Sequence, residues 1–442
     1  QVTDVRLGAF DPSVSPSGKK MAYTAFSHLG HRVYMQEVNP SEWEPFEYDP
    51  EINPLPLYTT KEDQADSAFV SNVEEREFEA RPYKTLSKLF NVHSWNPVLS
   101  NPNQRELGID LEVDDKMGTF STTLGYRYNL NEERGRFIGE VAYGGLFPVL
   151  RAGLIGNNKR SVSRIKIDAT DTLIVGVSQE WTETSLYAGA TVPLNLTFGN
   201  MFTSLDLSAD LLWQHLEYEP SDERFEQGVD ENIQSLDFTL NFSTLKQQAK
   251  RHLFPRVGFG TYLKYRTTLG DSHNQGSNFF AQAYGFIPSP FKTHGLRLLV
   301  SHNSQDHQRT YRFTNFFGGS RGYAVPLHDQ ATKFEATYAL PIAYPDWAVG
   351  PLAFIQRIQA RPFFDYTSYR INRVEDRASG LVWNGVNTEM TSAGLELLFD
   401  FRLLRLLDAR MGVRYSRLMN PDALFHDGST DAIEFVFLSL TP

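Results

Sequence analysis

The residues with the clearest potential for chemistry lie in one glycine-rich stretch, Phe316-Phe317-Gly318-Gly319-Ser320-Arg321-Gly322-Tyr323. Its centre fits Gly-x-Ser-x-Gly, the pattern in which hydrolases expose a nucleophilic serine at a turn between a strand and a helix. The segment that follows, Tyr323-Ala324-Val325-Pro326-Leu327, does not begin a helix. We therefore do not expect a hydrolase here. The other reactive group is Arg321, whose guanidinium can bind a carboxylate through two parallel hydrogen bonds.

Histidines near this stretch are the next candidates for catalysis. His302, His307 and His328 are close to it in sequence, and we expect them at solvated loop ends. None of the eleven histidines belongs to an H-E-x-x-H motif, and no Asp-x-Asp-x-Asp-Gly calcium loop occurs. The chain has no cysteine, so thiolate ligands and thiol nucleophiles are excluded. We expect no enzyme activity, no metal and no cofactor.

The composition indicates a β-rich protein that does not bind nucleic acid. The 442 residues include 32 Phe and 20 Tyr, residue types that strands favour. The net charge of −11 is opposite in sign to that of most nucleic-acid-binding proteins. The mean hydropathy is negative, and no run of eighteen apolar residues occurs, which argues against a membrane protein built of helices.

From about residue 105 the chain alternates apolar and polar residues, which is typical of strands with two different faces. The segment 234–243 is an example, with the sequence Gln-Ser-Leu-Asp-Phe-Thr-Leu-Asn-Phe-Ser. We predict about sixteen strands: 105–115, 117–130, 134–145, 148–156, 170–181, 183–194, 201–216, 232–246, 255–268, 277–288, 294–304, 330–342, 351–366, 388–399, 406–418 and 431–440.

These segments are longer than ordinary soluble strands, which average about five or six residues. Their polar faces carry glycine and charges of both signs, as the wall of a water-filled lumen would. A soluble β-sandwich would also alternate, but the length favours an all-β fold with a 16-stranded antiparallel transmembrane β-barrel over residues 105–442.

The first 104 residues have a different pattern. Residues 1–40 contain Ser15-Pro16-Ser17-Gly18-Lys19-Lys20, a turn followed by a short strand. This resembles the "SPDGKxIAF" turn and strand of a TolB-like β-propeller, with Ser17 where the family has aspartate. The resemblance implies a terminal blade, and an isolated hairpin is the alternative. Residues 41–104 are rich in proline, and we interpret them as a connector into the barrel.

The glycine-rich stretch resembles the "VRGF/VRGY" signature of the BamA/TamA superfamily of outer-membrane assembly and translocation barrels. The matching residues are Ser320-Arg321-Gly322-Tyr323, with serine where the family often has valine. The resemblance implies a loop that folds into the lumen between strands eleven and twelve. It also implies that Arg321 pairs with an acidic residue on strand thirteen, and Asp365 in Arg361-Pro362-Phe363-Phe364-Asp365 is that residue.

Physical reasons also favour placing this stretch inside the lumen. Gly318, Gly319 and Gly322 would let the backbone approach the wall, and Arg321 and Tyr323 would hold it there. Asp365 would anchor the loop, because a guanidinium inside a barrel needs a carboxylate.

The resemblance implies the outer membrane of a Gram-negative-type cell, with the propeller segment periplasmic. It implies handling of polypeptide during insertion or export, lipid or lipopolysaccharide around the barrel, and periplasmic or outer-membrane protein partners. Two features depart from the family: no POTRA domain precedes the barrel, and the last strand lacks a terminal aromatic residue. The alternative is a passive channel or structural outer-membrane barrel with an inward-folded loop.

Overall fold

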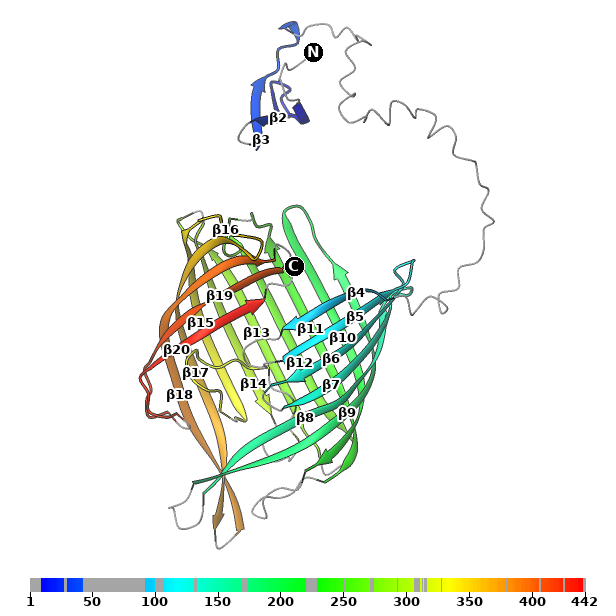
Figure 1. The fold of residues 1–442 in the computed structure, drawn as a ribbon, viewed down its shortest axis with the longest axis vertical. Helices are drawn as coiled ribbons and strands as arrows, with labels where there is room; N and C mark the ends of the chain where they lie inside the picture. The colour runs from blue at the N-terminus through cyan, green and yellow to red at the C-terminus, as the bar shows by residue number, and fades with distance from the viewer. Residues whose placement is uncertain are drawn as a thin grey trace, which may run out of the picture. The chain divides into compact units, whose positions relative to one another are not determined.

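The computed structural model describes residues 9–27, 30–42, 92–99, 106–130, 133–167, 174–219, 229–249, 251–270, 274–291, 293–305, 311, 313, 316–326, 328–377, 380–404, 407–423 and 426–439. The chain divides into two compact units, Gln1–Pro82 and Tyr83–Pro442. Each unit is described by itself below, and both are drawn in Figure 1.

The first unit contains a small antiparallel sheet in the order β1-β2-β3. Its elements are β1 Ala9–Val14, β2 Lys20–Ser27, β3 Gly30–Glu37 and the short 3-10 helix η1 Pro40–Glu42. The turn between β1 and β2 is closed by the backbone N–H of Gly18, which donates to the Ser15 carbonyl at 2.9 Å. The sequence predicts this turn and its strands, and that these strands form a propeller blade stays a prediction.

The second unit is one large antiparallel sheet that curves into a barrel (Figure 1). Its described strands are β4 Val92–Leu99, β5 Glu106–Asp114, β6 Phe120–Asn129, β7 Arg134–Tyr143, β8 Val149–Ile167, β9 Ile174–Asn195, β10 Met201–Tyr218, β11 Glu231–Lys246, β12 Gly258–Leu269, β13 Ser277–Pro288, β14 Gly295–Gln305, β15 Gln330–Ala343, β16 Trp347–Val349, β17 Ala353–Arg377, β18 Gly380–Leu403, β19 Leu407–Leu418 and β20 Asp431–Ser439. No helix in these described ranges is long and apolar enough to cross a membrane.

The strands follow one another around the wall in chain order, and β20 is followed by β4, which makes the wall a ring. We call the β20–β4 junction the seam. The all-β fold with one large antiparallel sheet agrees with the sequence prediction.

Two errors in the predicted strand list cancel in number. The pattern predicts separate strands at 170–181 and 183–194, whereas the structure has the single strand β9. The polar residues Glu180, Thr182 and Glu183 interrupt the apolar alternation there without any turn residue. Conversely, β4 lies within residues 41–104, which we interpret from the sequence as a connector, and it pairs with β5. Pro97 and the polar residues around it hide β4, because proline is tolerated in a strand only at an edge or irregularity.

The two faces of the wall differ as the alternation predicts. In β15, Lys333, Glu335 and Thr337 are buried and point to the interior, whereas Phe334 between them is 51% exposed on the outside. Exposed apolar side chains of this kind come from strands all around the ring: Leu107, Leu124, Phe137, Leu154, Leu186, Leu207, Phe238, Tyr265, Phe279, Leu298, Phe334, Phe364, Leu395, Val413 and Ile433. The outer surface is therefore apolar and the interior, or lumen, is polar, as in a barrel surrounded by lipid.

The barrel has two different ends because consecutive strands alternate in direction. Segments 219–230, 270–276, 306–329 and 419–430 connect strands at one end, which we call the loop end. Segments 115–119, 196–200, 247–257 and 344–352 connect strands at the other, which we call the turn end. The glycine-rich stretch belongs to the loop between β14 and β15, so it enters the lumen from the loop end.

Candidate lumen site

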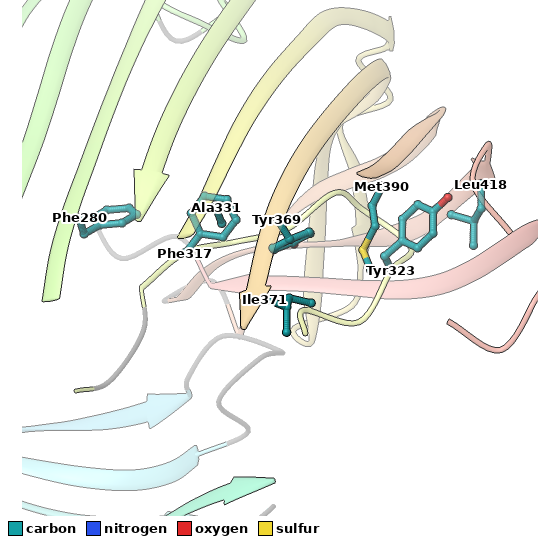
Figure 2. Packing of buried hydrophobic residues seen from close by; sticks show 8 residues of the cluster. All are labelled: Phe280, Phe317, Tyr323, Ala331, Tyr369, Ile371, Met390 and Leu418. Carbon is teal, nitrogen blue, oxygen red and sulfur yellow. The ribbon is translucent and has the colours of Figure 1, made fainter. Parts of the chain in front are cut away.

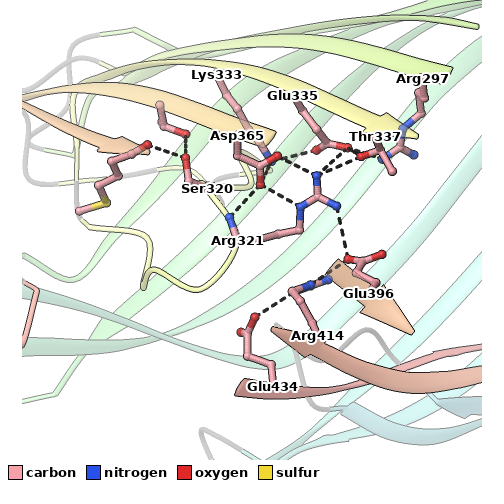
Figure 3. A network of polar contacts seen from close by, with 12 residues as sticks. Arg297, Ser320, Arg321, Lys333, Glu335, Thr337, Asp365, Glu396, Arg414 and Glu434 are labelled. Atoms are coloured by element: carbon pink, nitrogen blue, oxygen red, sulfur yellow. Dashed lines mark hydrogen bonds and ion pairs between the residues drawn. The ribbon is translucent and has the colours of Figure 1, made fainter. Parts of the chain in front are cut away.

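Arg321 is held against Asp365 of β17 inside the barrel (Figure 3). Its Nε donates to Oδ2 of Asp365 at 2.8 Å, and its Nη2 donates to Oδ1 at 2.7 Å. The backbone N–H of Arg321 adds a third bond to Oδ2 at 2.9 Å. The guanidinium also lies over the Phe363 ring, with Cζ 3.8 Å from the ring centroid. Asp365 is fully buried and the Arg321 side chain is 11% exposed. Each charge therefore compensates the other for the water that it has lost.

The remaining donors of Arg321 reach two neighbouring strands. Nη2 donates to Thr337 Oγ1 of β15 at 3.0 Å and lies 3.6 Å from Oε1 of Glu335. Nη1 donates to Glu396 Oε1 of β18 at 3.3 Å. One side chain of the loop therefore touches the lumen faces of β15, β17 and β18.

Ion pairs continue from this point to both sides of the wall. Toward β14, Glu335 forms an ion pair with Arg297. It forms another with Lys333 of its own strand, at 3.0 Å. Toward the seam, Glu396 accepts from Arg414 Nε of β19 at 2.8 Å, and Arg414 Nη1 donates to Glu434 of β20 at 3.1 Å. Figure 3 shows the unbroken path from Arg321 through Glu396 and Arg414 to Glu434.

Ser320, the residue that fits the hydrolase pattern, is buried and fully engaged with the wall. Its Oγ donates to the Met390 carbonyl of β18 at 2.7 Å and lies 2.7 Å from Thr367 Oγ1 of β17. The chain after Ser320 forms a turn. In this arrangement the hydroxyl attaches the loop to β17 and β18.

The nearby histidines do not occupy the solvated loop ends that we expect from the sequence. His302 lies within β14, where Nδ1 is 2.9 Å from Thr332 Oγ1. His328 is buried between Phe317 and Tyr369, at ring distances of 5.4 and 5.2 Å. That prediction is wrong for both: His302 lies within the strand that the alternation itself predicts at 294–304, and the loop brings His328 into the buried interior. His307 lies outside the described residues.

Tyr323 continues the loop's attachment toward the last strands. Its hydroxyl donates to the Thr391 carbonyl at 3.2 Å and accepts from the Asn420 backbone N–H at 3.0 Å. Its ring belongs to a cluster of buried side chains that Figure 2 shows along the inner wall: Phe280, Phe317, Tyr323, Ala331, Tyr369, Ile371, Met390 and Leu418. The loop residues Phe317 and Tyr323 thus make apolar contacts with the wall in addition to the polar contacts of Ser320 and Arg321.

The glycines of the stretch have different structural reasons. Gly322 has φ +87°, and a Cβ there would lie 2.8 Å from both Leu418 Cδ2 and Ser416 Cβ. A Cβ on Gly319 would lie 2.3 Å from the Tyr369 hydroxyl, whereas one on Gly318 would meet nothing within 4 Å. Only Gly322 combines a left-handed backbone with contact against the wall.

The first half of the loop is attached to the opposite part of the ring, which the sequence does not predict. Tyr311 and Phe313 join a buried cluster with Trp181, Leu216 and Ile233 of β9, β10 and β11. The Tyr311 hydroxyl accepts a bond from Gln214 Nε2 at 3.1 Å, and burial raises the pKa of this hydroxyl well above its ordinary value.

Phe316 fixes the middle of the loop to β12. Its ring lies 5.1 Å from both Lys264 Nζ and Arg266 Cζ, and these two cations also pair with Asp237. The loop between β14 and β15 thus crosses the lumen and is attached to β9–β12 on one side and β15–β20 on the other. The high aromatic content of residues 311–317 is the only sequence signal for this second attachment.

Comparisons with known proteins give no family and only low-identity similarity to solved structures. No family model and no curated protein matches the sequence. Among solved structures, the chain is similar to BamA from Haemophilus ducreyi lacking POTRA domains 1–3, with 12% identity, a TM-score of 0.45, and coverage of 75% of this chain and 66% of that one. CdiB from Escherichia coli has 10% identity and a TM-score of 0.45, with coverage of 78% of this chain and 62% of that one. CdiB from Acinetobacter baumannii has 9% identity and a TM-score of 0.39, with coverage of 77% of this chain and 57% of that one. The chain spans less than two thirds of each of these structures.

Proposed function

We propose that this chain is an outer-membrane β-barrel of a Gram-negative-type cell that handles polypeptide, assisting either insertion of barrel proteins or protein export. The exposed apolar surface around the ring supports the membrane location, because such a surface would aggregate in water. The resemblance of Ser320-Arg321-Gly322-Tyr323 to the BamA/TamA signature supports the role in assembly or translocation.

The single observation that carries the role is the ion-pair path from Arg321 to Glu434. It links an inward-folded loop to β20, the last strand before the seam. In a barrel whose seam opens, the path would let the position of the loop stabilise or release β20.

The seam has properties suited to opening. Counting described residues, β4 and β20 have 8 and 9, the neighbouring β5 also has 9, and β17 and β18 have 25 and 24. A strand edge freed at this junction could pair with an incoming strand through backbone hydrogen bonds. The work would come from strand pairing and local thinning of the membrane, without chemical catalysis or a cofactor.

Partners follow from the same proposal. Lipid or lipopolysaccharide would surround the barrel, and a periplasmic or outer-membrane protein would bind the part of the chain outside the membrane. The unit Gln1–Pro82 would supply that contact as part of a TolB-like propeller in the periplasm.

The test is reconstitution. The purified chain is inserted into lipid vesicles, and the folding rate of a urea-denatured model barrel protein is compared with its rate in empty vesicles. Because the chain has no cysteine, cysteine pairs placed along β4 and β20 can lock the seam on oxidation. We expect faster folding with the wild type, loss of the effect on locking, and recovery with reductant. Equal rates with and without the chain would contradict the proposal.

The alternative is a passive channel or structural barrel in which the loop is a permanent plug. Attachment of the loop to both sides of the ring favours this reading over a freely open pore. Planar-bilayer recording separates the two: a large steady conductance, together with no effect on folding of the model substrate, would support the channel.

A further inference from the structure

A second segment also enters the lumen, from the turn end. It consists of residues 251–257, a described part of the connection between β11 and β12, and we call it the inner turn. Leu253 and Phe254 of the inner turn are buried, and they pack against Ala339 and Phe286. Ala339 is fully buried on the same face of β15 as Glu335 and Thr337, so Phe254 lies on the lumen side of the wall.

The wall is shaped to receive Phe254. A Cβ on Gly295 of β14 would lie 3.0 Å from Phe254 Cβ, so the absence of a side chain there makes room for the ring. The Phe286 ring centroid is 5.4 Å from that of Phe254. The inner turn is also held by Tyr344, whose hydroxyl donates to the Arg251 carbonyl at 3.3 Å.

Two arginines contact the Phe254 ring. Arg297 Cζ lies 5.7 Å from the ring centroid and Arg361 Cζ lies 5.1 Å from it. A cation over an aromatic face is stabilised by the ring, but by much less than a carboxylate would provide inside a protein.

Both arginines have unused binding capacity. Arg361 is only 8% exposed, yet no carboxylate of the described residues lies within 4.0 Å of its nitrogens, and its Nε donates to the neutral Gln359 at 2.9 Å. Arg297 binds Glu335, but its buried Nε has no hydrogen-bond partner in the described part of the chain. Among the described side chains, the other arginines on the inner faces of β17 and β19 are Arg357, Arg410 and Arg414, and each has an ion pair.

The carboxylates nearest to Arg361 are already occupied. Glu396 is opposite Arg361 in register but accepts from Arg321 and Arg414. Asp400 accepts from Arg357 and Arg410 and from Gln359. Among the described residues, Arg361 therefore has no carboxylate of its own at the point where Phe254 lies.

We propose that Arg297 and Arg361 form an oxyanion site in the lumen, for a carboxylate or phosphate group, and that the inner turn is its removable cover. Phe254 occupies the place of the anion when the cover is closed. Withdrawal of Phe254 opens the turn end and exposes two guanidinium groups to the incoming group. This site goes beyond the proposed handling of polypeptide and does not require it.

The test uses the absence of cysteine in the chain. In an Ala339→Cys variant, a water-soluble maleimide can react only beneath Phe254, and Phe198→Cys in an exposed turn reports full reactivity. We expect slow labelling of Ala339→Cys and labelling faster by about tenfold or more when Phe254→Ala is added, because the cover then no longer limits access. Slow labelling in both variants, or full reactivity before Phe254 is changed, would overturn the cover.

The anion is then tested in the Phe254→Ala background. Millimolar inorganic phosphate should slow labelling of Ala339→Cys, and addition of Arg361→Gln should abolish this protection. Protection that survives Arg361→Gln, or no protection at all, would overturn the anion site. A short poly-glutamate peptide serves as the second probe: stronger protection by the peptide assigns the site to polypeptide carboxylates, and stronger protection by phosphate assigns it to free or lipid phosphate.

Folding of each variant is checked by heat-modifiable gel mobility. If Phe254→Ala does not fold, Phe254→Leu keeps most of the volume and removes the aromatic face, and the same two comparisons are made with it. Since none of these measurements uses a folding substrate, failure of this proposal and failure of the proposed function are distinguishable.

Discussion

Arg321 and Asp365 meet through two parallel side-chain hydrogen bonds, of 2.8 and 2.7 Å, and a third from the Arg321 backbone at 2.9 Å. The loop residue and the wall residue are 44 positions apart, and the carboxylate is fully buried. This contact helps to hold the second half of the loop between β14 and β15 against the wall, because a buried guanidinium without a carboxylate would be strongly destabilised.

The first prediction concerns Asp365→Asn. Removing one charge of a buried pair costs about 3–5 kcal/mol in the free energy of unfolding, because the other charge stays buried without compensation. Glu335 and Glu396 offset part of this cost, since both approach Arg321. We expect a lower urea midpoint in vesicles, altered heat-modifiable mobility, and protease cleavage within 306–329.

The matched control for that variant is Asp431→Asn. Asp431 pairs with Arg417 at 2.7 Å on the outside of the barrel, and both side chains are exposed. Exposed pairs contribute about 0–1 kcal/mol, so the midpoint should change little. Equal effects of the two substitutions would contradict the special role of Asp365.

A second prediction compares two glycines of the loop. Gly322→Ala should destabilise the loop by about 1–3 kcal/mol, because the left-handed backbone is strained for alanine and its Cβ collides with Leu418 and Ser416. Gly318→Ala has open space and should be close to neutral. Loop proteolysis and urea unfolding measure the difference, and indistinguishable variants would show that the loop tolerates a shift away from β19.

The aromatic attachment of the first half of the loop leads to a third prediction. Tyr311→Ala should cost about 3–5 kcal/mol as an upper estimate, because it empties a buried place beside Trp181 and Leu216. Tyr311→Phe loses only the bond from Gln214 and should cost about 1 kcal/mol.

The measurement for Tyr311 is trypsin cleavage at Arg309 and Arg312, mapped by mass spectrometry. Cleavage should increase strongly in Tyr311→Ala and slightly in Tyr311→Phe, while Arg321 stays protected in both. Simultaneous exposure of Arg321 would mean that the two attachments are one cooperative unit.

The fourth prediction concerns acid pH and the turn between β5 and β6. Asp115 accepts hydrogen bonds from the backbone N–H groups of Phe120 and Thr119 at 2.8 and 2.6 Å. The Phe120 bond, above all, holds the pKa of Asp115 below its ordinary value of 3.8. A lowered folded pKa means that this stabilisation is complete above pH 3.8 and is lost as pH falls through the folded pKa.

Asp115→Asn should therefore unfold at lower urea than the wild type at pH 7, and the difference should shrink as the pH falls below 3.8. Urea titrations of both proteins across this range test it. A difference that does not depend on pH would show that the ionised form of Asp115 contributes nothing.

Much of the fold follows from the sequence by itself. Period-two alternation is written into each strand, because side chains of a strand point alternately to its two sides. It therefore predicts most strands of the barrel, the apolar outside and the polar lumen. Strand limits are less well determined by the sequence. The pattern divides β9 into two predicted strands at Glu180–Glu183, because a polar interruption inside a long strand looks the same as a turn. It misses β4, because Pro97 is unusual within a strand.

The loop site divides in the same way. The stretch around Arg321 and its partner Asp365 could be named from the sequence, through its resemblance to a family signature and the need of a buried arginine for a carboxylate. Only the tertiary structure decided the path from Arg321 to Glu434, the attachment of Tyr311 beside Trp181, and the seat of Phe254 against Arg361. These contacts depend on strand register and on how the loops return into the lumen, and both are determined by residues far apart in the chain, whereas alternation needs only near neighbours.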